Sequence, residues 1–132
     1  PGATAPTYAT VGSVGMDLYA MHDAIVYDNA VEYVHTGVRV EVPFGYGVLI
    51  LPRSGTSIKG LSIVNSPGLI DPDYRGEIII LMRKIYHRSE IVRAGDRIAQ
   101  MVLVELPRIE LEQVESLSQT ARGAGGFGST GS

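Results

Sequence analysis

The sequence predicts an all-β fold, a jelly-roll β-sandwich or barrel made of many short strands. Short apolar runs recur along the chain, and Gly, Pro or charged residues bound each of them. No pattern with the 3.6-residue period of a helix persists over three turns without Gly or Pro. Because a small sandwich must cover its strand edges, the chain is also expected to pack against copies of itself.

Five stretches justify the predicted elements. Valines alternate with charged residues over 38–42, which is the two-residue period of a half-buried strand. Residues 54–59 are the best candidate for a helical turn. Continuous apolar runs over 48–51, 78–82 and 101–106 are typical of strands buried on both faces.

The composition fits one domain over 1–132, with 1–8 as a flexible lead-in and 118–132 as a flexible glycine-rich arm. The net charge of -3 argues against a general nucleic-acid binder, which needs a basic surface. Without cysteine, and with three separated histidines, any metal is expected to be a hard, oxygen-bound one. The chain shows neither a membrane-length apolar run nor a signal-peptide pattern, which indicates a cytoplasmic protein.

Two carboxylates are candidates for chemistry. Asp17 lies in an otherwise apolar stretch, where a carboxylate is costly unless it is hydrogen-bonded or near a cation. Taken alone, a solvent-facing Asp17 on the outer side of its strand is the simpler interpretation. Asp71 follows two apolar residues, and partial burial there would let it accept a proton from water. An acidic turn tip is the alternative for Asp71.

Residues 52–60 and 95–100 carry polar groups suited to an anion. A buried strand followed by Arg53, Ser54 and Gly55 would present a guanidinium, a hydroxyl and backbone N-H groups. A plain turn with an N-cap serine explains that stretch nearly as well. Gln100 heads an apolar strand and needs hydrogen-bond partners. Arg97 could simply form a surface pair with the preceding Asp96, which would contribute little.

The stretch 65–77 predicts a hairpin able to recognise a nucleoside. Gly68 and the turn at 71–73 would form the hairpin, whose backbone edge could pair with a base. Asn65 could also pair with a base through its donor and acceptor, and Tyr74 could pack on a sugar face.

The arm has the composition of a phosphate grip with a stacking ring. Its glycines let backbone N-H groups approach oxyanions, and Phe127 offers a flat face of the kind nucleobases stack on. The arm's remaining binding candidates are a cation, a glycine and two hydroxyls: Arg122, Gly128, Ser129 and Thr130. A floppy glycine linker is the alternative. The whole inventory lacks a thiol or a histidine centre and fits hydrolysis of a magnesium-bound nucleoside polyphosphate.

Five segments carry these candidate residues. In chain order they are 12–20 around Asp17, 52–60, 65–77, 95–100 and the arm. Taken in that order, they resemble the five signature motifs of the homotrimeric dUTP pyrophosphatase (dUTPase) family. The resemblance runs from about Pro6 to Gly131. It implies a jelly roll that assembles as a trimer with three shared active sites. The implied reaction is Mg²⁺-dependent conversion of dUTP to dUMP and pyrophosphate, which limits uracil in DNA and supplies dUMP for dTTP synthesis. The second motif departs from the usual pattern, because Thr56 and Ser57 replace Leu-Ala.

The resemblance also implies residue roles. Asp17 would hold Mg²⁺ through water, and Asp71 would activate the water that attacks the α-phosphorus. Arg53, Ser54, Gly55 and Gln100 would contact phosphates. The nucleoside set would be Asn65, Gly68, Ile70, Asp71 and Tyr74, with Tyr74 excluding a 2′-hydroxyl. In the arm, Phe127 would stack on uracil beside Gly128, while Arg122, Ser129 and Thr130 clamp the γ-phosphate.

Two alternatives stay open on the sequence. A dCTP deaminase shares the fold, but that family needs a glutamate where this chain has Leu81, and it lacks this glycine-rich arm. A nucleotide-sensing regulatory protein could use the same pocket without turnover, although the presence of both Asp17 and Asp71 argues for catalysis.

Overall fold

A computed structural model describes residues 2–131, and the fold is nearly all β, as the sequence predicts. Pro1 and Ser132, the outermost residues of the predicted lead-in and arm, lie outside the described residues. The elements are β1 (Met16–Tyr19), β2 (Ala24–Tyr27), β3 (Glu32–His35), β4 (Tyr46–Leu51), α1 (Ser54–Ile58), β5 (Leu61–Ile63), β6 (Gly68–Ile70), β7 (Ile79–Lys84), β8 (Ser89–Val92) and β9 (Arg97–Glu105). Within residues 2–131, no helix has the length and apolar character needed to cross a membrane.

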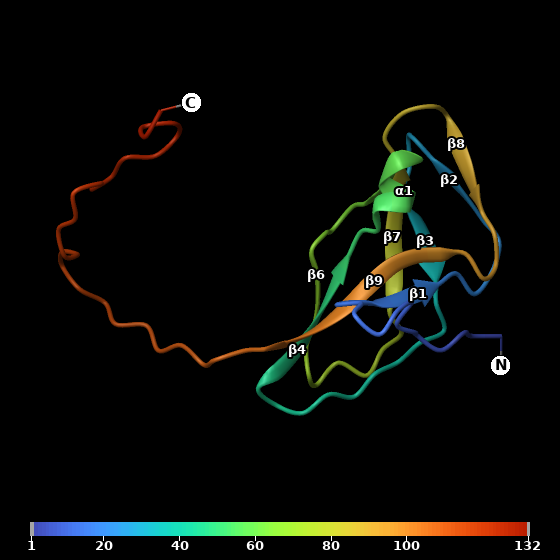
Figure 1. Cartoon of the computed structure of the whole chain (residues 1–132), viewed down its shortest axis with the longest axis horizontal. Helices are drawn as coiled ribbons and strands as arrows, with labels where there is room; N and C mark the ends of the chain where they lie inside the picture. Colours follow the sequence, from blue (N-terminus) through green and yellow to red (C-terminus); the bar gives the residue numbers. More distant parts are fainter. Residues whose placement is uncertain (1, 132) are drawn as a thin grey trace.

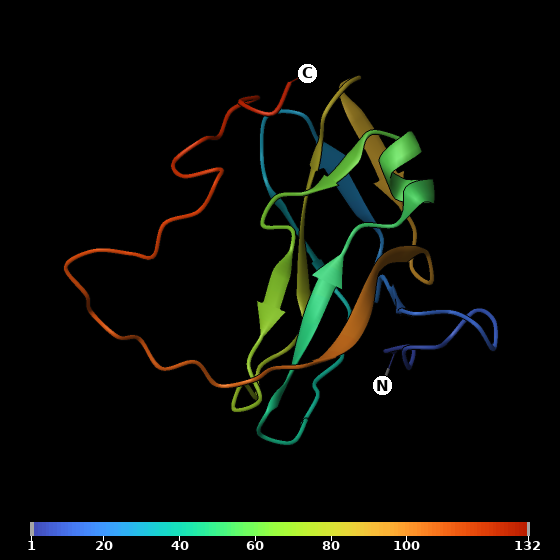
Figure 2. The same ribbon diagram turned by 60° about the vertical axis from the view of Figure 1, so that its left-hand side comes forward.

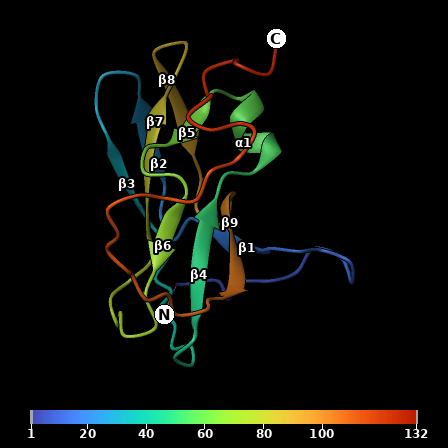
Figure 3. The ribbon, with the colours of Figure 1, turned by 90° about the vertical axis from the view of Figure 1, so that its left-hand side faces the viewer.

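The strands form antiparallel sheets that pack in two layers (Figures 1 and 3). One layer is the four-stranded sheet β1-β9-β4-β6. The other contains the three-stranded sheet β3-β7-β5 and the two-stranded sheet β2-β8. All of the pairings are antiparallel.

The core lies between these layers and draws aliphatic side chains from both. Leu18 of β1 and Ile98 of β9 are 0% and 1% exposed, and they belong to the same buried cluster as Val34 of β3 and Met82 of β7. Burying such side chains stabilises the fold by roughly 1.5–3 kcal/mol each. The alternation of inward and outward positions follows from the two-residue period of a strand.

Strand register brings three of the sequence motifs together. Asp17 of β1 pairs with Gln100 of β9, and Gln100 pairs on its other side with Leu51, the last residue of β4. Directly paired residues project to the same face of an antiparallel sheet. Arg53 follows two residues after Leu51, so the chain leaves β4 beside the carboxylate of Asp17.

The same register separates Asp71 from the phosphate motif. Ile70 of β6 pairs with Val48 near the start of β4, so Asp71 lies at that end of the strand. Arg53 and Ser54 instead follow the opposite end of β4. At ~3.3 Å per residue, the two ends are about 20 Å apart, which is too far for Asp71 and Ser54 of one chain to act on one phosphorus atom.

Two sequence predictions are wrong in detail. Residues 38–42 bury Val38 and expose Arg39 in the expected alternation, yet they pair in no described strand, because the backbone there makes only isolated bonds such as Ile78 N-H to the Val38 carbonyl at 2.8 Å. The stretch 68–77 is not a hairpin. It leaves β6 in one layer, turns at Asp71 and enters β7 in the other layer, so its two strands have different partners.

The apolar strands are less buried in the single chain than the sequence predicts. Leu103 of β9 is 54% exposed and Leu69 of β6 is 73% exposed. After β9 the chain leaves the sandwich and runs outside it without strand or helix, and its last part is the glycine-rich arm (Figures 1 and 2). The segment between β9 and the arm exposes large apolar side chains, including Leu111 and Leu117.

Candidate active site

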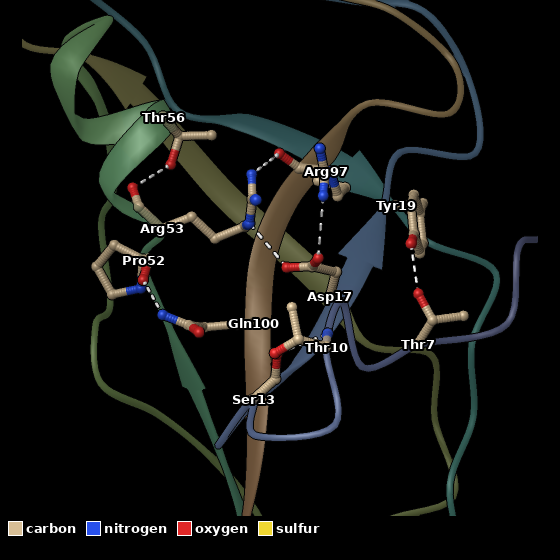
Figure 4. Close-up of polar contacts among 10 residues, drawn as sticks. All are labelled: Thr7, Thr10, Ser13, Asp17, Tyr19, Pro52, Arg53, Thr56, Arg97 and Gln100. Atoms are coloured by element: carbon tan, nitrogen blue, oxygen red, sulfur yellow. Dashed lines mark hydrogen bonds and ion pairs between the residues drawn. The ribbon is translucent and has the colours of Figure 1, made fainter.

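Asp17 is a buried carboxylate between two guanidiniums (Figure 4). Arg53 Nε donates to Asp17 Oδ1 at 2.8 Å, and Arg97 Nη1 lies 3.6 Å from Asp17 Oδ2. Asp17 is 6% exposed, so the interpretation that it faces solvent is wrong. The cluster holds two cations and one anion, and its net positive charge suits a polyanionic ligand.

Arg97 was not among the residues predicted for the site. The simple interpretation, a surface pair with Asp96, is wrong, because Asp96 Oδ2 instead accepts the backbone N-H of Arg93 at 2.9 Å. The signal that could have found Arg97 is the burial of Asp17, since a buried carboxylate requires cations or hydrogen-bond donors around it. Arg53 Nη1 also donates to the Arg97 carbonyl at 3.3 Å, which ties the two cations together.

Gln100 lies beside this charged cluster, in the middle of β9 and not at its start. Its Nε2 donates to the Pro52 carbonyl at 2.7 Å, which fixes the side-chain amide beside the chain leaving β4 (Figure 4). Gly15 leaves room for this amide, because a Cβ at residue 15 would come within 2.9 Å of Gln100 Oε1. A cavity of about 280 Å³ opens here, and its lining includes Asp17, Arg53, Ser54 and Gln100. We call it the phosphate cavity.

The turn after β4 places Ser54 at the first position of α1. Arg53, not Ser54, is the N-cap residue, and no side chain caps this helix end, so the interpretation of Ser54 as an N-cap is wrong. Thr56 Oγ1 donates to the Arg53 carbonyl at 2.8 Å and holds the turn closed. Thr56 is buried, so the residue that departs from the resembled motif packs into the fold beneath the turn. Gly55 lies outside the phosphate cavity but close to the Arg53 side chain.

A second cavity of about 310 Å³ lies beyond the other end of β4. Its polar lining comes from Asn65, Asp71, Tyr74 and Glu77, and its apolar lining from Tyr33, Leu69, Ile70, Ile79 and Leu81. This mixture, apolar walls with a few convergent polar groups, is typical of a small-molecule site. We call it the nucleoside cavity. Gly68 is buried against Ile50, and a Cβ there would meet the Ile50 Cβ at 3.2 Å, so a larger residue at this position would press on β4.

Two hydrogen bonds order the loop around the nucleoside cavity. Tyr74 N-H donates to the Asp71 carbonyl at 3.1 Å, and Tyr74 Oη donates to the Glu77 carbonyl at 2.9 Å. Tyr74 packs directly over Gly76, where a Cβ would come within 2.3 Å of the Tyr74 hydroxyl. The hydrogen bond from His35 holds the pKa of Glu77 below its ordinary value of 4.5, against the raising effect of burial. Glu77 therefore contributes stability above that value and loses it as the pH falls through its lowered pKa.

No described residue lines both cavities. The arm residues line neither one. Arg122 Nε donates to the Gly125 carbonyl at 2.8 Å, and Ser129 N-H donates to the Gly126 carbonyl at 3.1 Å, so the arm is shaped only by its own turns. The Phe127 ring is fully exposed, and Gly128 and Thr130 follow it in the same outer segment. One chain thus presents the predicted residues as three separate groups.

The carboxylate inventory limits how a metal could bind. Over residues 2–131, no three Asp, Glu, His or Cys side chains lie close enough to hold an ion. Asp17 stands alone in the phosphate cavity, and both of its oxygens face guanidiniums. Mg²⁺ prefers oxygen ligands, keeps several waters and is often held by one or two carboxylates together with substrate phosphates. The site therefore fits Mg²⁺ that arrives with a polyphosphate, not an ion held by the protein alone.

Comparison with known proteins decides the family. The family model for dUTPase matches residues 2–131. The chain belongs to the dUTPase family. A curated relative, the deoxyuridine 5'-triphosphate nucleotidohydrolase of Anaplasma marginale (strain St. Maries), is 44% identical over 133 residues, which cover 98% of this chain and 90% of that protein.

Solved dUTPase structures share the fold. A mutant dUTPase of Staphylococcus bacteriophage 80alpha, solved with dUpNHpp, superimposes with a TM-score of 0.90 at 28% identity, covering 99% of this chain and 94% of that one. The predicted jelly-roll class is thereby confirmed. A mutant dUTPase from phage phi11 of S. aureus superimposes with a TM-score of 0.80 at 24% identity, covering 89% of this chain and 94% of that one. That protein coordinates a structural Mg(II) ion.

Proposed function

We propose that this dUTPase-family chain hydrolyses dUTP to dUMP and pyrophosphate in a site shared between subunits. The observation that carries the proposal is the division of the predicted residues between two ends of β4. The cationic phosphate cavity lies at one end and the nucleoside cavity at the other, about 20 Å away by strand length. A nucleotide that needs both must bridge two chains.

A homotrimer with three equivalent sites is the proposed assembly. Each site would combine the nucleoside cavity of one chain with the phosphate cavity of a second and the arm of the third. The exposed apolar residues of β6, β9 and the arm support burial against other copies, because exposed apolar surface of this kind marks interaction sites. We place the protein in the cytoplasm, where a dUTP pool is available.

The phosphate cavity would hold the triphosphate through charge and geometry. Arg53 supplies a guanidinium to the cavity and is already aligned by Asp17, and Arg97 adds positive charge from the other side of Asp17. Ser54 presents a hydroxyl and Gln100 a fixed amide, and the backbone N-H of Gly55, just outside the cavity, would reach a phosphate at the turn. Preorganised donors of this type stabilise the negative charge that develops on the departing pyrophosphate. Mg²⁺, bound through water to Asp17, would offset further phosphate charge.

The nucleoside cavity would select uracil and deoxyribose. The Asn65 amide and the backbone of Ile70, which line the cavity, would offer donors and acceptors for the base edge, together with the backbone of the neighbouring Gly68. Tyr74, fixed over Gly76, would lie against the sugar and leave no room for a 2′-hydroxyl. Asp71 follows Ile70 in the same wall, and its carboxylate would accept a proton from the water that attacks the α-phosphorus.

The arm would complete the site after the nucleotide binds. Phe127 would stack on uracil, since every base offers a π-face to an exposed ring. Arg122, Gly128, Ser129 and Thr130 would contact the γ-phosphate. The arm's lack of contacts with its own sandwich supports a role on another chain.

The test is pyrophosphate release from dUTP, dCTP, dTTP and UTP at equal concentration with Mg²⁺. Selective hydrolysis of dUTP is expected. Comparable rates on all four substrates would defeat the specificity, and release of ammonia from dCTP would assign a deaminase instead. The apolar side chain of Leu81 in the nucleoside cavity argues against the deaminase outcome, because it has no proton-transferring group.

A further inference from the structure

Beyond the residues assigned so far, Glu77 fastens the loop that carries Asp71 and Tyr74 to the rest of the fold. Glu77 Oε1 accepts the backbone N-H of Gly37 at 2.7 Å. Its other oxygen, Oε2, lies 3.0 Å from His35 Nδ1. Both oxygens are thus engaged by the end of β3 and the residues that follow it. The Glu77 carbonyl meanwhile accepts the Tyr74 hydroxyl.

The segment that anchors Glu77 is itself held in place. Thr36 is fully buried, and its Oγ1 donates to the Ile78 carbonyl at 2.6 Å. Ile78 N-H in turn donates to the Val38 carbonyl at 2.8 Å. Gly37 adopts a φ of +69°, and a Cβ there would lie 2.7 Å from the Ala3 side chain, so its amide is fixed by both conformation and packing. The Glu77 carboxylate therefore accepts its hydrogen bonds from donors that are held in place.

We infer that Glu77 is a positioning residue for sugar discrimination: its carboxylate, held by His35 and Gly37, sets the height of Tyr74 over the nucleoside cavity. The inference rests on the proposed function, because it assumes that Tyr74 excludes the 2′-hydroxyl. Glu77 itself lines the cavity, but its two oxygens are occupied, so it acts through Tyr74 and not on the substrate.

A second link, through Arg75, supports the same loop but is expected to contribute less. Arg75 Nη2 donates to Glu41 Oε1 at 2.9 Å, and Arg75 Nη1 donates to the Pro72 carbonyl at 2.6 Å. Both partners of the Arg75 and Glu41 pair are more than half exposed, whereas the Glu77 side chain is 23% exposed. Exposed pairs contribute little, so the Glu77 link is expected to dominate the position of Tyr74.

The test compares Glu77→Ala, Glu77→Gln and Asp23→Ala in dUTP and UTP hydrolysis. Asp23 is the matched control: its carboxylate also accepts one backbone N-H, from Ala94, and one side-chain donor, from Arg93, but it lies outside the nucleoside cavity. Glu77→Ala is expected to reduce the ratio of kcat/KM for dUTP over UTP about tenfold, mainly through KM. Glu77→Gln keeps an acceptor for Gly37 and should restore most of the ratio. Asp23→Ala should leave it unchanged.

The outcomes separate the inference from the proposed function. If the unmodified protein does not prefer dUTP over UTP, the proposed function fails before Glu77 is tested. If it does prefer dUTP and Glu77→Ala keeps the same ratio, the inference is wrong. A merely destabilised variant would lower the amount of active enzyme and reduce the rates on both substrates equally, so it would leave the ratio intact. An equal change in Asp23→Ala would also overturn the inference.

Discussion

Arg53 Nε and Asp17 Oδ1 lie 2.8 Å apart and join the end of β4 to β1 across the intervening strand β9. The contact has two consequences. It allows a carboxylate to remain buried in an apolar strand, and it holds the guanidinium of Arg53 at the mouth of the phosphate cavity. Structure and proposed chemistry therefore depend on the same pair.

Asp17→Asn should weaken the response to Mg²⁺. The variant removes the charge that would hold the hydrated ion and leaves Arg53 and Arg97 without their anion. We expect dUTP hydrolysis at saturating Mg²⁺ to fall at least ~10-fold and the Mg²⁺ concentration for half-maximal rate to rise, because lost second-sphere contacts typically cost 10–100-fold. Asp23→Asn, which breaks a remote carboxylate and arginine pair, is the control. An unchanged Mg²⁺ titration in Asp17→Asn would remove Asp17 from this role.

Asp71→Asn should bind dUTP and fail to turn it over. The amide keeps the shape of the side chain but cannot take a proton from water, so turnover should fall at least ~100-fold, the lower range for loss of a general base. Calorimetry would measure dUTP affinity, and pyrophosphate release would measure turnover. Asp73→Asn, two residues further along the same turn, should be nearly normal. Near-normal turnover by Asp71→Asn would exclude the proton-transfer role.

Phe127→Ala should weaken dUTP binding without altering the stability of the sandwich. The ring is fully exposed and the hydrogen bonds of residues 118–131 all lie within that segment, so the melting temperature should not move. Loss of one stacked base contact is worth ~1–3 kcal/mol, which predicts a KM increase of roughly 5- to 160-fold. Phe127→Tyr keeps a flat ring and serves as the control. If Phe127→Ala binds dUTP normally, the arm is a linker and not a lid.

Particular residues show which parts of the structure could be predicted from the sequence. The apolar runs at 48–51 and 78–82 were predicted as strands because local periodicity and composition determine such runs. The helical turn at 54–59 was also predicted correctly. The environment of Asp17 was not, because its burial depends on strand register with β9, and register is set by contacts far apart in the sequence.

The nucleoside loop illustrates the same limit. Its turn at Asp71 was predicted from Pro and Asp, which act locally. Its passage between two layers could not be, since a hairpin and a crossover have the same local composition. The links from Glu77 to His35 and Gly37 span about forty residues of chain, and nothing in the spacing indicates them.

Mixing two inactive variants would test the shared site most directly. Asp71→Asn removes the catalytic carboxylate from the nucleoside cavity, and Ser54→Ala with Arg53→Ala disables the phosphate cavity. If the two half-sites of one nucleotide come from different chains, randomly mixed trimers of the two variants should recover about one quarter of the unmodified activity, the product of two even chances. If both half-sites came from one chain, every site in the mixture would carry a defect and no activity would return. Light scattering should first give the mass of three 14.1-kDa chains, about 42 kDa, for each variant and for the mixture. A stable, active monomer would contradict both the assembly and the argument from strand register.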